Sequence, residues 1–327
     1  MSAESRICAG PRAKVTAVTS HRSSLALACF LVAGCPSADP DPEPTPDPTA
    51  ADPCADSMNE GSVRVLGNGF TGGTEGIAFS PDGRLFVSRG DVLDEVFPDG
   101  SHEEFAAIPA QVGLTWWNGE LIVASGDSGE ADGLGGVYAV NIETGDVRLL
   151  AGGIAGANFP VVTPWDTLLV STPGGDEEIV QVTSDGELSL WTDAVPTPNG
   201  IGFSADGSAA YIVSTYGNPA PLWEVPVTDG LAGAPTALVS WGQAVAPDGV
   251  AMGASGDVYI AQNIASRIDR VDPTAPPEPD DAVLAGGINF AASAAFGVGE
   301  DWDRCALYVT SLFSDELFVV GAGEPGL

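Results

Sequence analysis

Short apolar runs recur along the chain from about residue 61, and turns rich in Gly, Pro, Asp or Ser separate them. Many runs come in pairs joined by a turn dipeptide such as Asp82-Gly83 or Asp206-Gly207, which is typical of a β-hairpin. No stretch beyond the N-terminal segment has a sustained helical period. The pattern therefore predicts an all-β protein built from many short strands.

The paired runs repeat six times, with first residues 37 to 49 residues apart, a period in the range of propeller blades. A third apolar run follows every pair, and a fourth follows the first five pairs. The sixth pair has no fourth run, but SVRVLG at 62–67 resembles the fourth runs elsewhere and can close the ring without an exposed edge. The sequence predicts a six-bladed β-propeller over 61–327, closed by an N-terminal strand. The paired runs are 75–88, 112–125, 158–172, 199–215, 248–262 and 292–311.

The first 60 residues have a different composition. Residues 1–35 combine a basic leader with the apolar stretch LALACFLVA and then LVAGC, which resembles the lipobox of bacterial lipoproteins. The resemblance implies cleavage before Cys35, lipidation of Cys35 and anchoring of an exported protein on a periplasmic or outer membrane surface. An ordinary secretory signal is the alternative. Residues 36–60 are rich in Pro and Asp, and we expect a disordered linker.

Charge and cysteine content narrow the picture further. After residue 35 the chain has 7 Arg, no Lys and 44 acidic residues, so nothing could neutralise the phosphates of a nucleic acid. Cys54 and Cys305 are the cysteines left in an exported chain, which makes them a disulfide candidate. The propeller topology puts both at the same end of the last blade.

The first residue of each paired run begins the innermost strand of its blade, where the blades converge on the central channel. In chain order these residues are Glu75, Val112, Asn158, Asn199, Asp248 and Ala292. One interpretation of Asn199-Gly200 and Asp248-Gly249 is ordinary turn chemistry. The favoured interpretation is a site for a hard cation, because four of the six positions carry a side-chain oxygen. Oxygen ligands alone indicate Ca²⁺, with Mg²⁺ or Mn²⁺ as alternatives, rather than Zn²⁺.

The segments EGIAFSPDGRLFVS, PNGIGFSADGSAAYIVST and APDGVAMGASGDVYIAQ resemble the senescence-marker-protein/gluconolactonase family of calcium-dependent propeller hydrolases. The resemblance covers roughly residue 61 to the C-terminus. It implies that Glu75, Asn199 and Asp248 bind the metal, and that Asn158 is a further ligand or a substrate contact. It also implies that Asp248 is the catalytic base and that the substrate is a small lactone or ester.

Two positions depart from the pattern of the sugar lactonases. They usually have Arg two residues before the third-blade Asn and Asp directly after it, where this chain has Gly156 and Phe159. Specificity for a sugar lactone is therefore not implied. The loops beside the site are expected to contact substrate, and their candidate residues are Arg89, Tyr216, Asn218 and Asn263. Arg89 could replace the missing guanidinium.

The alternative function is a non-catalytic propeller that binds a ligand or a protein and uses calcium only to stabilise its channel.

Overall fold

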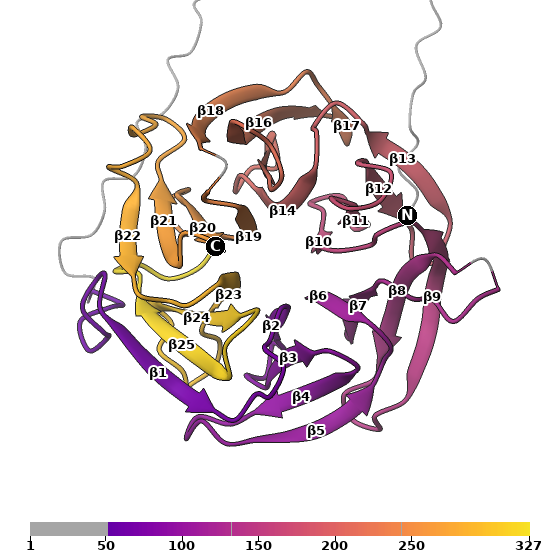
Figure 1. Cartoon of the computed structure of the whole chain (residues 1–327), viewed down its shortest axis with the longest axis horizontal. Helices are drawn as coiled ribbons and strands as arrows, with labels where there is room; N and C mark the ends of the chain where they lie inside the picture. Colours follow the sequence, from indigo (N-terminus) through magenta and orange to yellow (C-terminus); the bar gives the residue numbers. More distant parts are fainter. Residues whose placement is uncertain (1–51, 132, 243) are drawn as a thin grey trace, which may run out of the picture. The chain divides into compact units, whose positions relative to one another are not determined.

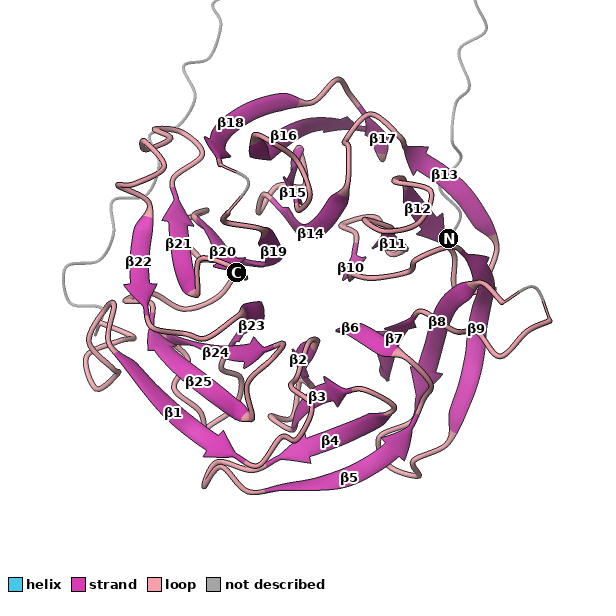
Figure 2. Ribbon diagram, viewed as in Figure 1, coloured by secondary structure: helices cyan, strands magenta, loops and turns pink. Residues whose placement is uncertain are grey.

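Six antiparallel sheets are arranged as blades around a central axis, as Figures 1 and 2 show. The structure is a computed structural model that describes residues 52–131, 133–242 and 244–327. These residues belong to one unit, and all of their regular secondary structure is β-strand. The predicted signal segment, the predicted lipidation site Cys35 and most of the predicted linker lie outside the described residues. Among the described residues we find no helix that could cross a membrane.

The first three blades each contain four strands in simple up-and-down order. Blade 1 contains β2 (Ile77–Phe79), β3 (Leu85–Arg89), β4 (Val92–Val96) and β5 (His102–Ala107). Blade 2 contains β6 (Gln111–Trp117), β7 (Glu120–Ser125), β8 (Gly135–Val140) and β9 (Val147–Ile154). Blade 3 contains β10 (Pro160–Val162), β11 (Leu168–Ser171), β12 (Ile179–Val182) and β13 (Leu188–Thr192).

The remaining blades repeat this order with two variations. Blade 4 contains β14 (Pro198–Phe203), β15 (Ala209–Ser214), β16 (Ala220–Thr228) and β18 (Thr236–Trp241), with the short β17 (Leu231–Ala232) beside β16. Blade 5 contains β19 (Pro247–Met252), β20 (Val258–Gln262), β21 (Arg267–Val271) and β22 (Val283–Gly286). Blade 6 contains β23 (Ala291–Phe296), β24 (Ala306–Ser311), β25 (Glu316–Gly321) and β1 (Val63–Asn68).

The N-terminal strand closes the ring. β1 pairs antiparallel with β25, from Val63 opposite Val320 to Asn68 opposite Glu316. A disulfide joins Cys54 to Cys305 with their Cα atoms 5.6 Å apart, so it fastens the segment before β1 to the β23–β24 connection. The predicted all-β propeller with N-terminal closure is confirmed, because the sixth blade takes its outermost strand from the start of the domain.

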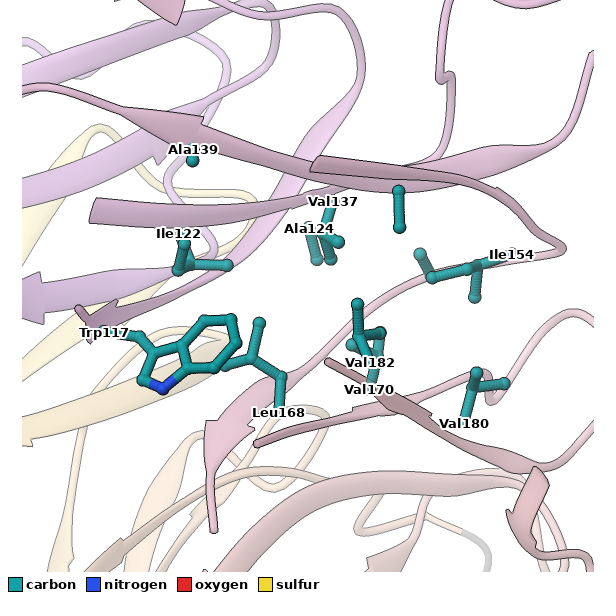
Figure 3. Packing of buried hydrophobic residues seen from close by; sticks show 12 residues of the cluster. Trp117, Ile122, Ala124, Val137, Ala139, Ile154, Leu168, Val170, Val180 and Val182 are labelled. Atoms are coloured by element: carbon teal, nitrogen blue, oxygen red, sulfur yellow. The ribbon is translucent and has the colours of Figure 1, made fainter. Parts of the chain in front are cut away.

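The hydrophobic core is divided among the six interfaces between neighbouring blades. One cluster, shown in Figure 3, packs Trp117 and Ile122 of blade 2 against Leu168, Val170 and other residues of blade 3. The other interfaces contain corresponding clusters. The second strand of each blade is buried on both sides and therefore reads as a continuous apolar run. This packing holds the starts of the innermost strands in fixed positions around the channel.

Candidate metal centre

The four oxygen-bearing residues of the repeat lie where the innermost strands begin. Asn199 and Asp248 are the second residues of β14 and β19. Glu75 and Asn158 lie two residues before β2 and β10, and their backbone amides donate to the carbonyls of Ser88 and Ser171 at 3.1 and 3.0 Å. Each side chain is thus carried by a hairpin rather than by a free loop.

A Gly follows three of these residues, and close packing between blades leaves no room for a side chain there. The three are Gly76, Gly200 and Gly249. Gly200 lies inside β14, and a Cβ there would meet the backbone nitrogen of Val250 in blade 5 at 2.7 Å. A Cβ on Gly249 would meet the Cα of Ser293 in blade 6 at 2.7 Å. The turn interpretation of Asn199-Gly200 is therefore excluded. By contrast, Gly207 has a φ of 69° and its amide bonds the Ser204 carbonyl, as expected of a true hairpin turn.

The orientation of the Asn199 amide follows from its partners. The Thr215 hydroxyl donates to the Pro247 carbonyl at 2.6 Å, so it can only accept a hydrogen bond from Asn199. The Asn199 Nδ2 donates to Thr215 Oγ1 and to Asp248 Oδ1, both at 2.9 Å. Consequently the Asn199 Oδ1 faces away from both partners. It is buried and has no hydrogen-bond donor in the described part of the chain.

Asp248 is buried at the centre of the cluster. Its Oδ2 accepts from Asn263 Nδ2 at 3.4 Å, and the same amide also donates to the Phe290 and Ala291 carbonyls. Burial and the nearby charge of Glu75 raise the pKa of Asp248 well above its usual value, against the opposing effect of the bonds from Asn199 and Asn263. The carboxylate is therefore held in position by two amides but incompletely stabilised as an anion.

Glu75 completes the group from blade 1. Loss of hydration raises its pKa to about 7, and the Asn158 side chain, which hydrogen-bonds the carboxylate, lowers the pKa. The Thr310 hydroxyl donates to the Glu75 carbonyl at 2.5 Å and fixes the backbone there. Two electrostatically coupled carboxylates and a buried amide oxygen without a donor form a set of oxygen ligands suited to a divalent cation. The described residues contain no group of three or more His, Cys, Asp or Glu side chains that could hold a metal ion, here or elsewhere. With only two carboxylates, Glu75 and Asp248, this set depends on the amide oxygens of Asn158 and Asn199 for further ligands.

The four loop residues expected to contact substrate have different surroundings. Tyr216 is exposed and directly follows Thr215, which bonds Asn199; partial burial and the charges of Asp248 and Glu75 raise the pKa of its hydroxyl. Asn218 is exposed on the same loop, with no hydrogen bond of its side chain to the cluster. Asn263 is buried and holds Asp248, so its geometry indicates a positioning role.

The expectation for Arg89 requires correction. Its guanidinium makes two hydrogen bonds to the fully buried Asp94, at 2.5 and 2.9 Å, and also lies 3.7 Å from Glu104. The neighbouring strand β4 supplies this aspartate. Arg89 is therefore committed to an ion pair within its own blade and cannot replace the missing guanidinium of the sugar lactonases without abandoning a buried carboxylate.

The sequence interpretation missed Thr215. In blades 4 and 5, Pro198 pairs with Ser214 and Pro247 pairs with Gln262, so Thr215 and Asn263 are equivalent residues directly after the second strand. Each bonds the metal-ligand candidate of its own blade. The sequence feature that could have revealed this role is a polar residue directly after the second strand in both blades.

A cavity of about 1390 Å³ lies in the other half of the channel. Its walls are later residues of the innermost strands, such as Phe79, Phe203 and Met252, together with the β23–β24 connection. None of the four oxygen-bearing residues lines it. The candidate centre is therefore separate from this cavity, whose lining contains both apolar and charged side chains.

Fold and site together define a six-bladed propeller with a cluster of oxygen ligands at one end of its axis. The family model for the SMP-30/gluconolactonase/LRE-like region matches residues 87–313, and the chain belongs to this family. Among curated proteins none matches the chain significantly.

Solved structures share the fold at low sequence identity. The chain is similar to a calcium-binding protein, regucalcin, from Agrobacterium tumefaciens, with 22% identity, a TM-score of 0.65, and 81% of this chain and 94% of that chain covered. A gluconolactonase from Xanthomonas campestris has 17% identity and a TM-score of 0.64, with 81% and 89% covered. A luciferin-regenerating enzyme has 15% identity and a TM-score of 0.64, with 81% and 97% covered.

Proposed function

We propose that this protein is a calcium-dependent hydrolase that opens a lactone or cleaves an ester of a small molecule. The observation that carries the proposal is the Asn199 Oδ1, a buried oxygen without a donor beside the buried Asp248 carboxylate. Burying such an oxygen without a partner costs free energy that a cation at this point would recover. Membership of the gluconolactonase-like family supports a lactonase type of hydrolase.

Calcium is the cation that fits the ligands best. Glu75, Asn158, Asn199 and Asp248 offer oxygens only, and Ca²⁺ accepts carboxylate and amide oxygens in a flexible geometry. The two carboxylates would balance its charge and lose the mutual repulsion that contributes to the raised pKa of Asp248. The similar protein from Agrobacterium tumefaciens is described as calcium-binding, which supports the choice. Mg²⁺ and Mn²⁺ are the alternatives.

The residues of the chain divide the chemistry between them. A divalent cation, when bound, supplies Lewis acidity that polarises an ester carbonyl and increases the acidity of water. Asp248 accepts the proton of the attacking water and returns it to the leaving alkoxide, so that one water is consumed for each ester bond broken. Asn199 and Asn263 orient the Asp248 carboxylate throughout, and Thr215 holds Asn199.

Turnover with defined metal content tests this proposal. The purified protein is stripped with a chelator, reloaded with Ca²⁺, Mg²⁺ or Mn²⁺, and assayed against a panel of lactones and aryl esters. We expect calcium to restore hydrolysis and Asp248→Ala to reduce kcat by about 10²-fold or more. Asp206→Ala is the matched control, because this exposed carboxylate caps a hairpin turn through Ser204 and Ser208. Calcium binding without turnover in the wild type would instead favour the non-catalytic alternative.

We also propose that Cys35 is lipidated and that the protein is held on a membrane surface by this anchor. The lipobox-like LVAGC and the Pro/Asp-rich residues 36–60 support the assignment. Metabolic labelling with a fatty acid should mark the wild type and not Cys35→Ser, and the variant should leave the membrane fraction. Equal labelling of both proteins would contradict the anchor.

A further inference from the structure

The loops around the candidate centre differ in character from one side to the other. In blades 4, 5 and 6 the loops after the second strand carry Tyr216, Ile264 and Phe313, whose exposed fractions are 67%, 56% and 71%. A single exposed apolar side chain needs no explanation, but three on adjacent blades around one site indicate a surface that is covered in the functional state.

Tyr216 and Ile264 are attached directly to the residues that form the centre. Tyr216 follows Thr215, the acceptor of the Asn199 amide. Ile264 follows Asn263, the donor to Asp248. Their loops are anchored on the segments that enter β14 and β19, because the Thr215 amide bonds the Thr197 carbonyl and the Ile264 amide bonds the Val245 carbonyl, both at 3.1 Å. These side chains therefore stand at the edge of the centre.

Phe290 and Phe313 continue the same edge into blade 6. Their rings are packed edge to face with centroids 5.1 Å apart. The Phe290 carbonyl accepts from Asn263 Nδ2 at 3.3 Å and from the Leu312 amide at 3.0 Å. Farther on, the Thr74 amide bonds the Ser311 carbonyl at 2.8 Å, directly before Glu75. Tyr216, Ile264, Phe290 and Phe313, which we call the apolar arc, thus extend from Asn199 to the neighbourhood of Glu75.

The opposite side of the centre is acidic. The loops of blades 2 and 3 expose the carboxylates of Asp127, Glu130, Asp176 and Glu177. With Glu75 and Asp248 they create a negative potential that disfavours an anionic substrate. The arginines at this end offer no compensation for it, because Arg89 and Arg267 are each paired with a buried aspartate, Asp94 and Asp269.

We propose that the apolar arc receives the hydrophobic substituent of an uncharged lactone or ester whose carbonyl lies beside Asp248. The inference rests on the proposed hydrolase function for the reaction and adds the class of substrate, an alkyl- or aryl-substituted one rather than a polyhydroxylated sugar. The polar carbonyl would meet the oxygen cluster while the substituent covers Tyr216, Ile264, Phe290 and Phe313.

The test measures in two ways how substrate binding depends on the length of an alkyl substituent. Calcium-loaded protein is given γ-lactones with alkyl substituents of increasing length as substrates. The corresponding lactams serve as binding probes, because an amide bond is much less reactive toward water than an ester bond. We expect 1/KM and lactam affinity to rise by about fourfold for each methylene that reaches the arc. In the double variant Ile264→Ser/Phe313→Ser, the ratio of affinities for the longest and the shortest alkyl lactam should fall by about tenfold or more. Leu190→Ser is the matched control, because Leu190 is 56% exposed on the outermost strand β13.

Each outcome separates this inference from the proposed function. Lactam binding that depends on chain length and on the apolar arc supports the inference even if no lactone is hydrolysed, a result that would overturn the hydrolase proposal alone. The inference is overturned if wild-type lactam affinity is independent of the length of the alkyl substituent, or if Leu190→Ser loses as much of this dependence as the double variant. The hydrolase proposal survives either result as long as lactones are hydrolysed. A double variant that loses binding to phosphatidylethanolamine/phosphatidylglycerol vesicles with unchanged lactam affinity also overturns the inference, because the apolar arc would then face a membrane.

Discussion

Asn199 has two hydrogen-bond donors on its amide nitrogen and two partners that can only accept, so its oxygen is left free by geometry. The constraint starts at Thr215, whose single proton goes to the Pro247 carbonyl. The direction of this amide is thus determined by Asp248 together with Thr215, which is not itself a candidate metal ligand. Residues that orient ligands in this way commonly affect metal affinity by an order of magnitude or more.

Thr215→Val tests this control over Asn199. The substitution keeps the shape of the side chain but removes the acceptor, so only the hydrogen bond to Asp248 Oδ1 still orients the Asn199 amide. We expect Ca²⁺ affinity to fall by about 10- to 100-fold with the fold retained, as measured by calorimetric titration and circular dichroism. Thr163→Val is a suitable control, since Thr163 is also buried and bonded but lies in the β10–β11 turn. Unchanged affinity in Thr215→Val would show that Asn199 does not depend on it.

The titration of Glu75 gives the centre a pH dependence. Its pKa is raised from 4.5 to about 7, so protons compete with a cation below pH 7. We expect the Kd for Ca²⁺ to increase as the pH falls from 7 to 5, by up to about tenfold per pH unit for each proton displaced. The calcium-free protein should show the opposite trend in stability, because a raised carboxyl pKa means that stability is lost as pH rises from 4.5 to 7. Titrations and thermal unfolding with chelator between pH 5 and 8 measure both, and a constant Kd would contradict the assignment.

At the scale of strands, most of the fold could be predicted because its signals are local. Paired apolar runs with Asp-Gly turns define hairpins, and their common register brings Glu75, Asn158, Asn199 and Asp248 to one end of the channel. By contrast, the local pattern does not determine where a side chain at the end of a strand points, because its partner lies on another strand. Arg89 was misinterpreted for this reason, since Asp94 on the next strand captures it, and Thr215 was missed because its partner depends on the exact end of β15.

The innermost strands approach each other too closely for a side chain at the Gly positions. Gly200→Ala should cost about 1–3 kcal/mol, because the new Cβ would meet the backbone of β19. A fall in Tm of several degrees is expected in thermal unfolding, together with weaker Ca²⁺ binding as Asp248 is displaced. Gly174→Ala is the matched control, because no atom lies within 4 Å of its new Cβ and its φ is not in the left-handed region. Equal Tm values for both variants would argue against the tight strand contact.

For the whole molecule, closure of the ring joins residues that are far apart in the chain. β1 completes the sixth blade, and the Cys54–Cys305 disulfide spans a sequence separation of 251 residues. A covalent link across so long a loop restricts the unfolded chain strongly. The candidate centre depends on this closure, since Glu75 of blade 1 and Asp248 of blade 5 come together only when the ring is complete.

The double variant Cys54→Ser/Cys305→Ser tests this closure. It should lose about 2–4 kcal/mol of stability in denaturant unfolding while keeping the strands and Ca²⁺ binding at low temperature. A reducing agent should produce the same shift in the wild type and none in the variant. A wild type whose unfolding midpoint is unaffected by reduction would show that the disulfide adds nothing to the closed ring.

The central claim is that oxygens from separate blades hold one cation at the end of the channel. Calorimetric titration of the chelator-treated protein with Ca²⁺ tests it most directly, alongside Asn199→Ala and circular dichroism to verify folding. We predict one Ca²⁺ per chain in the wild type, and a loss of at least about tenfold in affinity when the Asn199 oxygen is removed. No binding by the wild type, or equal binding by a folded Asn199→Ala, would contradict the claim.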